Sequence, residues 1–496
     1  MNWSEERFSK LKRILDLWKC RHLTYKGKIV ILKTFILSRL VYTANVINCP
    51  PDMLKKLEKL MFDFLWGSPA ARVRKSDVVK DISNGGLNMI DLKTYFDSIN
   101  LKWVCKLMDD SKGKWKCFFE YWLETLGGVN ILINSRCDPK YVLKKELLLP
   151  KFYCNLLYTY FLYREMSYMK HNNILNDSKD VCKEVIWLNT HLRHFGKMLL
   201  FKNWIKSNII FVGDIVDKNG IMPMSKIKEK MVVYDAQFFS EYAKCCYAIN
   251  RIWSKKLRNN DLNGFIDYKN KTLTEGEYTF FEQNMSLSPT TSTKQIYKEL
   301  QKLQISESRA TLFWANIFRI KNSDINWQNL WKFKLHTVQD NTLVQFNFRF
   351  MYNILITPDN LFKWRKKDTN RCSLCAEIGT ISHMFYYCIT LCPFWKYIEN
   401  VIRKFSYDNS FTLKPQMMIY GFDYTKNNLV DLIIHYALLS IYRCSMLFVQ
   451  NEVSTNELKS MFKIVIRKRF HIEKNKKKQR LFTDITDWER LMNVLQ

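Results

Sequence analysis

The chain has 496 residues, of which 47% are hydrophobic and 15% aromatic. This is enough apolar material for the cores of two to four domains, so global disorder is not expected. Lys and Arg number 78 against 47 Asp and Glu, a formal net charge of +31. Such a charge repels itself in a compact chain unless a polyanion shares it, so RNA or DNA is the first partner to consider, and a membrane surface the second. A Lys-rich proteome would produce the same excess without any such partner.

Targeting signals and membrane spans are not expected from this sequence. The first residues, Met1–Arg7, have no apolar stretch behind a basic start, unlike a secretory signal or a transit peptide. The most apolar window, 429–447, is interrupted by Asp431, His435 and Arg443, so we expect no membrane partner. The fourteen cysteines are irregularly spaced apart from one cluster, which favours a reducing compartment, the cytoplasm or the nucleus.

The first part of the chain has the pattern of helices in series. Apolar residues recur at helical spacing over 53–66, between Pro50-Pro51 and Gly67, which predicts an amphipathic helix. A second helix is predicted from Leu92 to Met108, after the turn signal Asn84-Gly85-Gly86.

The middle of the chain is rich in aromatic residues and mostly helical by period, with one exception. Residues Ile209–Val216, the turn residues Asp217–Gly220 and then Ile221-Met222 predict a short β-hairpin. The Thr-, Ser- and Asn-rich stretch Asn263–Ser292 has the composition of a linker.

Helical patterns resume over 293–362 and again over 429–495, on either side of the cysteine cluster. The expected fold class is therefore mostly α. The expected regions are a helical region at 1–112, an aromatic-rich helical region at 113–290, a helical segment at 291–365, a segment with the cysteine cluster at 366–400 and a basic helical region at 401–496.

The strongest local signal is the pattern Cys372-x2-Cys375-x7-His383-x4-Cys388. Two cysteines separated by two residues can reach one metal from a single turn, and a His and a Cys five apart can complete a tetrahedron. Three thiolates and one imidazole suit zinc, and four protein ligands indicate a closed, structural site. Two alternatives remain open: ordinary buried cysteines, or a redox pair of Cys372 and Cys375. Cys392 is a spare thiol that could take the place of Cys388.

Cationic and aromatic residues lead directly into this pattern. Such a mixture is typical of surfaces that hold phosphates and stack unpaired bases, although a solvated helix face has the same composition. The candidate nucleic-acid contacts here are Lys363, Trp364, Arg365, Lys366, Lys367 and Arg371.

Several segments, in the same order along the chain, resemble the carboxy-terminal part of reverse transcriptases of LINE-type (non-LTR) retrotransposons. The stretch 23–42 is similar to the segment that follows the palm and enters the thumb, and 51–67 is similar to a thumb helix that ends in Phe-Leu-Trp-Gly. Gly85-Gly86-Leu87 resembles the turn that follows this helix, and the cysteine pattern resembles the family's zinc-binding knuckle. Weaker similarities to the family's connecting region and helical tail lie at 213–220, Trp327, 348–350, 420–422 and 441–443.

The resemblance implies that residues 1–112 are a thumb-like region that lies along a primer–template duplex. It also implies that 113–290 is a connecting region and 366–400 a zinc knuckle. The residues that match the family segment and would contact phosphates are Lys26, Lys28, Lys33 and Arg39. The family's catalytic carboxylates lie upstream of the thumb. Asp109-Asp110 mimics the catalytic pair but follows a helical pattern and lies beyond the thumb-like segment, so we expect no polymerase site in this stretch.

The expected function is therefore non-enzymatic binding of nucleic acid, with RNA such as the element's own transcript preferred, by the C-terminal region of such a reverse transcriptase. One alternative is that the reading frame continues upstream into an active RNA-directed DNA polymerase. The other is a host-adopted helical scaffold that binds protein.

Overall fold

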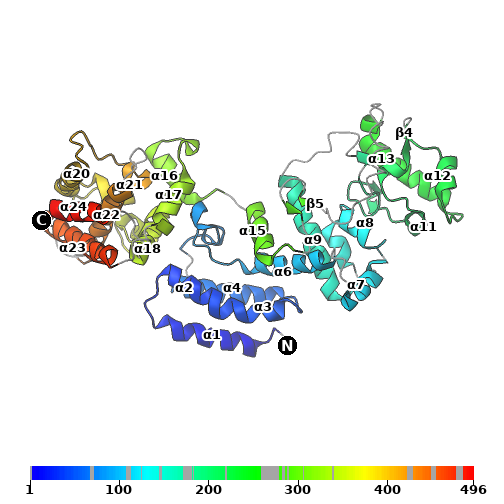
Figure 1. The fold of residues 1–496 in the computed structure, drawn as a ribbon, viewed down its shortest axis with the longest axis horizontal. Coiled ribbons are helices and arrows are strands. Elements are labelled where there is room, and N and C mark those ends of the chain that lie inside the picture. The colour runs from blue at the N-terminus through cyan, green and yellow to red at the C-terminus, as the bar shows by residue number, and fades with distance from the viewer. Residues whose placement is uncertain are drawn as a thin grey trace. The chain divides into compact units, whose positions relative to one another are not determined.

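The computed structural model describes residues 3–67, 72–107, 113–124, 126–144, 148–170, 181–182, 184–217, 220–257, 279–281, 285–286, 290–304, 307–337, 340–421, 428–447, 454–475 and 484–496. These residues fold mainly into helices, which confirms the expected mostly-α class (Figure 1). The α-helices are α1 (Glu5–Lys19), α2 (Tyr25–Ile31), α3 (Ser38–Ala44), α4 (Pro51–Trp66), α5 (Lys75–Val78), α6 (Leu92–Leu107), α7 (Lys114–Glu124), α8 (Val129–Asn134), α9 (Lys151–Lys170), α11 (Lys202–Lys206), α12 (Met224–Lys230), α13 (Phe238–Leu257), α15 (Thr293–Gln304), α16 (Arg309–Phe318), α17 (Trp327–Lys332), α18 (Asn341–Met351), α19 (Pro358–Lys363), α20 (Cys392–Ser406), α21 (Met417–Tyr420), α22 (Asn428–Leu447), α23 (Thr455–Lys474) and α24 (Ile485–Val494).

Short 3₁₀ and π turns connect or extend these helices. The π-helical segments are η1 (Leu32–Leu37), η8 (Phe333–Thr337) and η9 (His383–Tyr387). The 3₁₀ segments are η2 (Ile82–Asn84), η3 (Pro139–Leu143), η5 (Val212–Asp214), η7 (Asn322–Asp324) and η10 (Ile389–Leu391). The described strands form three antiparallel pairs, β1 (Arg193–His194) with β2 (Lys197–Met198), β3 (Val216–Asp217) with β4 (Gly220–Ile221), and β5 (Thr279–Phe281) with β6 (Met285–Ser286).

The chain divides into two compact units. The first comprises residues 1–3, 39–54 and 91–304, and the second comprises residues 4–38, 55–90 and 305–496. The chain thus passes between the units several times. The finer five-part division expected from the sequence stays a prediction.

The first unit contains two hydrophobic cores. One lies among α6, α7, α9 and α15, where Phe119 stacks on Tyr153 with ring centroids 4.6 Å apart. The other lies among the elements from 181 to 249, around the buried rings of Trp187 and Trp204. Figure 1 shows α11, α12, α13 and β4 gathered around this second core.

Two expectations for the first unit need correction. The predicted strand Ile209–Val216 is wrong over most of its length, because Val212–Asp214 forms a 3₁₀ turn in which the Asp214 carboxylate accepts the backbone N–H groups of Ile210 and Phe211. Only Val216-Asp217 pairs, with Gly220-Ile221, so the hairpin exists but is shorter than predicted. The stretch expected as a linker carries β5 and β6 in its described part.

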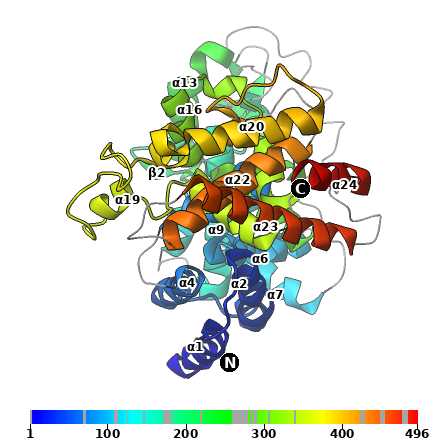
Figure 2. The same cartoon turned by 90° about the vertical axis from the view of Figure 1, so that its left-hand side faces the viewer.

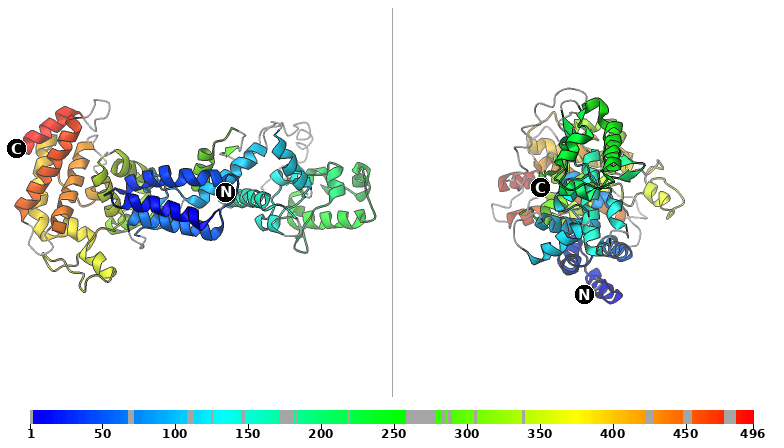
Figure 3. Two further views of the ribbon diagram at one scale, coloured as in Figure 1. Left: turned by 90° about the horizontal axis from the view of Figure 1, so that it is seen from below. Right: turned by 90° about the vertical axis from the view of Figure 1, so that its right-hand side faces the viewer.

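In the second unit, the C-terminal helices pack side by side. Helices α20, α22 and α23 contact one another, and α24 packs against α20 and α23. Figures 2 and 3 show α20, α22 and α23 running alongside one another from two directions. Helix α20 supports this packing because its apolar residues recur every three or four positions, from Phe394 to Phe405, and all face inward. Helix α18 also packs against α22 and α2.

The predicted boundaries of α4 and the predicted start of α6 are confirmed. Helix α4 begins at Pro51 and ends at Trp66, and Gly67 adopts a left-handed φ of +70° directly after it. Helix α6 begins at Leu92 as predicted and is described to Leu107, so the decoy pair Asp109-Asp110 lies outside the described residues.

Within the described ranges, no helix combines the length and the apolar character that crossing a lipid bilayer requires. All fourteen cysteines fall in the described ranges, and each is a free thiol.

Candidate metal centre

The first two candidate ligands come from a tight turn. The Cys372 N–H donates to the Glu377 carbonyl at 2.7 Å, and the Ala376 N–H donates to the Cys372 carbonyl at 3.0 Å. Ala376 has a left-handed φ of +61°, which closes the turn. The backbone N–H groups of Leu374 and Cys375 point at the Cys372 sulfur and favour its thiolate form.

The other two ligands flank a single helical turn. His383 begins the π-helix η9 and Cys388 follows it, and the Cys388 N–H donates to the His383 carbonyl at 2.9 Å. The Thr380 hydroxyl accepts from the His383 N–H at 3.2 Å, which fixes the start of the turn. A π-helical turn brings the fifth residue back beneath the first, so His383 and Cys388 face the same point.

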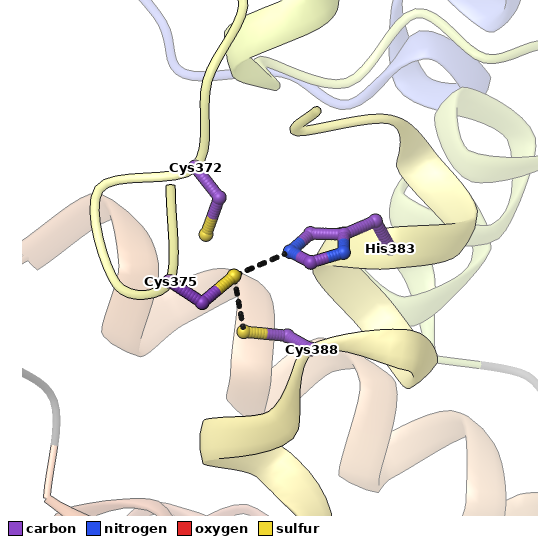
Figure 4. Close-up of side chains that lie close together, drawn as sticks. All are labelled: Cys372, Cys375, His383 and Cys388. Atoms are coloured by element: carbon purple, nitrogen blue, oxygen red, sulfur yellow. Dashed lines mark hydrogen bonds between the residues drawn. The ribbon is translucent and has the colours of Figure 1, made fainter. Parts of the chain in front are cut away.

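The four donor atoms converge on one point. All lie within 4.8 Å of one another. The Cys375 sulfur is 3.1 Å from His383 Nε2 and 3.7 Å from the Cys388 sulfur, and the Cys372 side chain points into the same space (Figure 4). Cys372, His383 and Cys388 are buried, and Cys375 is half-buried. These four residues could therefore hold one metal ion, enclosed on most sides by protein.

The donor set and spacing fit a tetrahedral metal. Two thiolates bound to one zinc ion at about 2.3 Å would lie about 3.8 Å apart, close to the Cys375–Cys388 separation of 3.7 Å. A disulfide requires sulfurs about 2 Å apart, so these cysteines are not an oxidised pair. Cys392 is exposed at the start of α20 and is not part of the cluster. The structure thus favours Cys388 over Cys392 as the fourth ligand.

The protonation states of the ligands depend on burial. Burial raises the pKa of the Cys372 thiol to about 11, and the charges of Cys388 and Cys375 act in the same direction. Burial also lowers the pKa of His383, against the attraction of Glu377, which favours the neutral imidazole that metals bind. A bound cation would offset the repulsion among the thiolates, so metal binding should release protons.

Three further residues position the ligands. Sequence reasoning had noted two of them, Gly379 as a place where the chain doubles back and Trp395 as part of the family resemblance. The Trp395 indole N–H of α20 donates to the Phe385 carbonyl in η9 at 3.0 Å. The Thr390 hydroxyl lies 3.0 Å from the Cys388 sulfur. Gly379 lies so close to α19 that a Cβ there would come within 2.7 Å of the Pro358 ring. Thr390 was not singled out, and the Thr380-x-x-His383 spacing, a capping pattern, is a further detectable signal.

The cationic segment that precedes the knuckle lies on the surface. All six candidate residues in 363–371 are exposed, and Trp364 exposes 42% of its surface. Lys363 pairs with Asp359 at 2.6 Å, and the Arg371 guanidinium donates to the Ala376 carbonyl at 2.9 Å. Within the described ranges Arg365, Lys366 and Lys367 have no ion pair.

The four thumb-like candidates are not part of the knuckle. Lys26 is exposed, whereas Lys28 is half-buried and donates to the Leu65 carbonyl at the end of α4, at 3.0 Å. Burial lowers the pKa of Lys33, which lies near Asp81. Arg39 is exposed but belongs to the other unit. Lys28 is therefore already engaged in holding α4, and Lys26 is the most accessible cation of the group within its own unit.

No model of a known protein family matches the chain.

Proposed function

We propose that this chain binds nucleic acid, with RNA preferred, and that the knuckle of Cys372, Cys375, His383 and Cys388 is a structural zinc site. The observation that carries the proposal is the closed four-ligand cluster directly joined to an exposed cationic and aromatic segment. In this view the chain corresponds to the C-terminal region of a LINE-type reverse transcriptase, as the segment order suggests.

The choice of zinc rests on ligand chemistry. Three thiolates and a neutral imidazole are soft donors that suit zinc, whereas magnesium and calcium prefer oxygen ligands. Four protein donors leave no open position for a water or a substrate, so the metal would stabilise the fold and would not act on a substrate. Zinc bound to three thiolates carries a net charge of −1, which nearby cations such as Arg371 would offset.

The choice of nucleic acid rests on the flank of the knuckle. Arg365, Lys366 and Lys367 are exposed and form no ion pair with any residue that the structure describes, and they lie beside the exposed ring of Trp364. Guanidinium and ammonium groups bind phosphates, and an exposed indole stacks on unpaired bases. Bases are unstacked mainly in single-stranded RNA and its loops, which is why RNA is preferred over duplex DNA.

The first test is metal analysis of the purified chain. We expect one zinc per chain, lost in Cys388→Ser and retained in Cys392→Ser, which is the matched control because it removes a thiol four residues away. Equal zinc content in both variants, or none in the natural chain, would contradict the assignment of the site.

The second test is RNA binding as a function of salt. Contacts to about five phosphates of a single strand would give a log–log slope of about −3 to −4. Changing Arg365, Lys366 and Lys367 together to Gln should reduce the steepness by about 2. The control makes the same number of charge changes elsewhere in the second unit, with Lys12→Gln, Lys396→Gln and Lys404→Gln combined. A salt-independent affinity would contradict nucleic-acid binding.

A further inference from the structure

A cavity of about 580 Å³ opens in the second unit, and none of the knuckle ligands lines it. Its walls include the segment before α5, the first turn of α16 and the end of α18. Three of the residues that line it are arginines, Arg72, Arg74 and Arg309, and two are aromatic, Phe313 and Tyr352. A cavity of this size matches a small organic ligand and is much larger than a single inorganic ion needs.

The charge of the cavity is strongly positive. The three arginines are exposed, and in the part of the chain that the structure describes none of them has an ion pair. The single carboxylate in the lining, Asp77, is neutralised by the Lys80 ammonium at 2.6 Å, with both side chains only 4% exposed. The cavity therefore presents three guanidinium groups with no protein counter-charge, an arrangement that selects an anion.

This positive potential reaches beyond the cavity. Burial lowers the pKa of Lys28, and the charge of Arg72 lowers it further. Arg72 therefore lies close enough to Lys28 for the two like charges to repel each other. An anion bound at Arg72 would reduce this repulsion, in line with the anion preference that the three arginines indicate.

The lining also includes two aromatic side chains. Phe313 lies one helical turn after Arg309, so both side chains project from the same face of α16. Phe313 is half-buried. The Tyr352 hydroxyl is engaged with the Gly85 carbonyl at 3.1 Å and the Ser308 hydroxyl at 3.2 Å, and its ring stacks against Trp331, so a rigid aromatic surface remains toward the cavity.

We propose that this cavity receives one nucleotide of a single-stranded nucleic acid. Arg72, Arg74 and Arg309 hold its phosphate, and Phe313 stacks on its base. Guanidinium groups next to an aromatic ring match the two chemically different halves of a nucleotide, whereas inorganic phosphate would leave the aromatic wall unused. This inference rests on the proposed nucleic-acid binding and adds a point of contact that does not involve the metal.

The test uses the full, zinc-loaded chain and a fluorescent single-stranded RNA oligonucleotide that carries 4-thiouridine for photo-crosslinking. In the variant with Arg72→Gln, Arg74→Gln and Arg309→Gln, the affinity should fall about tenfold and the salt slope should become less steep by about 1. Phe313→Leu should keep the slope, lower the affinity about tenfold and remove the crosslink from the peptide that contains residue 313. The control is again Lys12→Gln with Lys396→Gln and Lys404→Gln. Zinc content and thermal unfolding of each variant report whether it is folded.

Several results would overturn the inference. Equal losses in the cavity variant and the control would mean a general effect of charge, and a crosslink that persists in Phe313→Leu would mean that the base lies elsewhere. If AMP or inorganic phosphate bound at these arginines while the oligonucleotide ignored them, the site would serve free ligands and not a strand. If the natural chain bound RNA with a slope that depended only on 365–367, the cavity proposal would fail while the proposed function stood. Absence of any RNA binding would remove both.

Discussion

A buried lysine in the second unit should make the stability of this protein depend on pH in a measurable way. Lys334, in η8, exposes 1% of its surface, and its ammonium lies 2.6 Å from His435 Nε2 of α22 and 3.2 Å from the Met418 carbonyl. Burial lowers the pKa of Lys334 from 10.5 to about 7, against the attraction of Asp431. Burial, followed by the charge of Lys334, also holds the pKa of His435 well below its usual range.

The size of the effect follows from the pKa difference between the folded and unfolded chains. A fall from 10.5 to about 7 corresponds to about 5 kcal/mol of free energy of unfolding. Above pH 10.5 the lysine is neutral in both states and its charge costs nothing. As the pH falls toward 7 only the unfolded chain takes up the proton, so the stability decreases across this window. Between pH 9 and pH 7 the loss should be about 2 kcal/mol, because the folded chain is itself half-protonated at pH 7.

The assay is urea unfolding of the natural chain and of Lys334→Met at pH 7, 8 and 9, with zinc held constant. Methionine removes the titration but also leaves the His435 and Met418 acceptors without their donor, a cost that does not vary with pH in this range. The natural chain should therefore gain about 2 kcal/mol relative to the variant from pH 7 to pH 9. Titration of the cysteines is common to both proteins and cancels. Lys396→Met, at an exposed position, should follow the natural chain. Parallel pH profiles for Lys334→Met and the natural chain would refute the reasoning.

Three further substitutions test the packing around the functional residues. Gly379→Ala should destabilise the knuckle by about 1–3 kcal/mol and weaken zinc binding, because its Cβ would meet the Pro358 ring at 2.7 Å. The control is Gly27→Ala, whose Cβ has ordinary contacts at 3.6 Å and which should be neutral or stabilising. Equal effects of the two substitutions in a zinc-competition titration would contradict this prediction. Trp395→Phe removes the donor to the Phe385 carbonyl and should lower zinc affinity about tenfold, whereas the exposed Trp364→Phe should leave it unchanged. Glu473→Leu leaves the Arg469 charge buried, because both side chains are at most 1% exposed, and should lower the free energy of unfolding in urea by about 3–5 kcal/mol. Adding Arg469→Met should recover most of that loss. No recovery would argue against the importance of the Arg469–Glu473 ion pair.

The helices were predictable because their signals are local. The apolar spacing over 53–66, with proline before it and Gly67 after it, gives α4 to within two residues. The same holds for the start of α6. The pattern over 429–495 predicted a helical block there, without the separate bounds of α22, α23 and α24. The strand expected over 209–216 failed because the Asp214 carboxylate binds two backbone N–H groups and closes a 3₁₀ turn, and a run of β-branched residues gives no sign of that competition.

The cluster of candidate metal ligands was also predictable, because the spacing of its four residues brings them together within a short stretch of chain. The choice between Cys388 and Cys392 was not. It depends on η9, whose π-helical turn points Cys388 at the cluster while α20 carries Cys392 into solvent. Both cysteines lie at distances from His383 that a flexible chain could use.

What the sequence by itself determined, then, is the helical class, the positions of the strongest helices and the set of cysteine and histidine ligands, since each arises from contacts between near neighbours. Only the tertiary structure explains Gly85-Gly86, which looks like a simple turn: a Cβ at Gly85 would meet the Trp331 ring at 2.7 Å, and one at Gly86 would overlap the Lys80 carbonyl. The burial of Lys334 and the meeting of Arg72 with Arg309 likewise join residues far apart in the sequence. Periodicity carries no information about such meetings, because they are decided by which helix faces pack together.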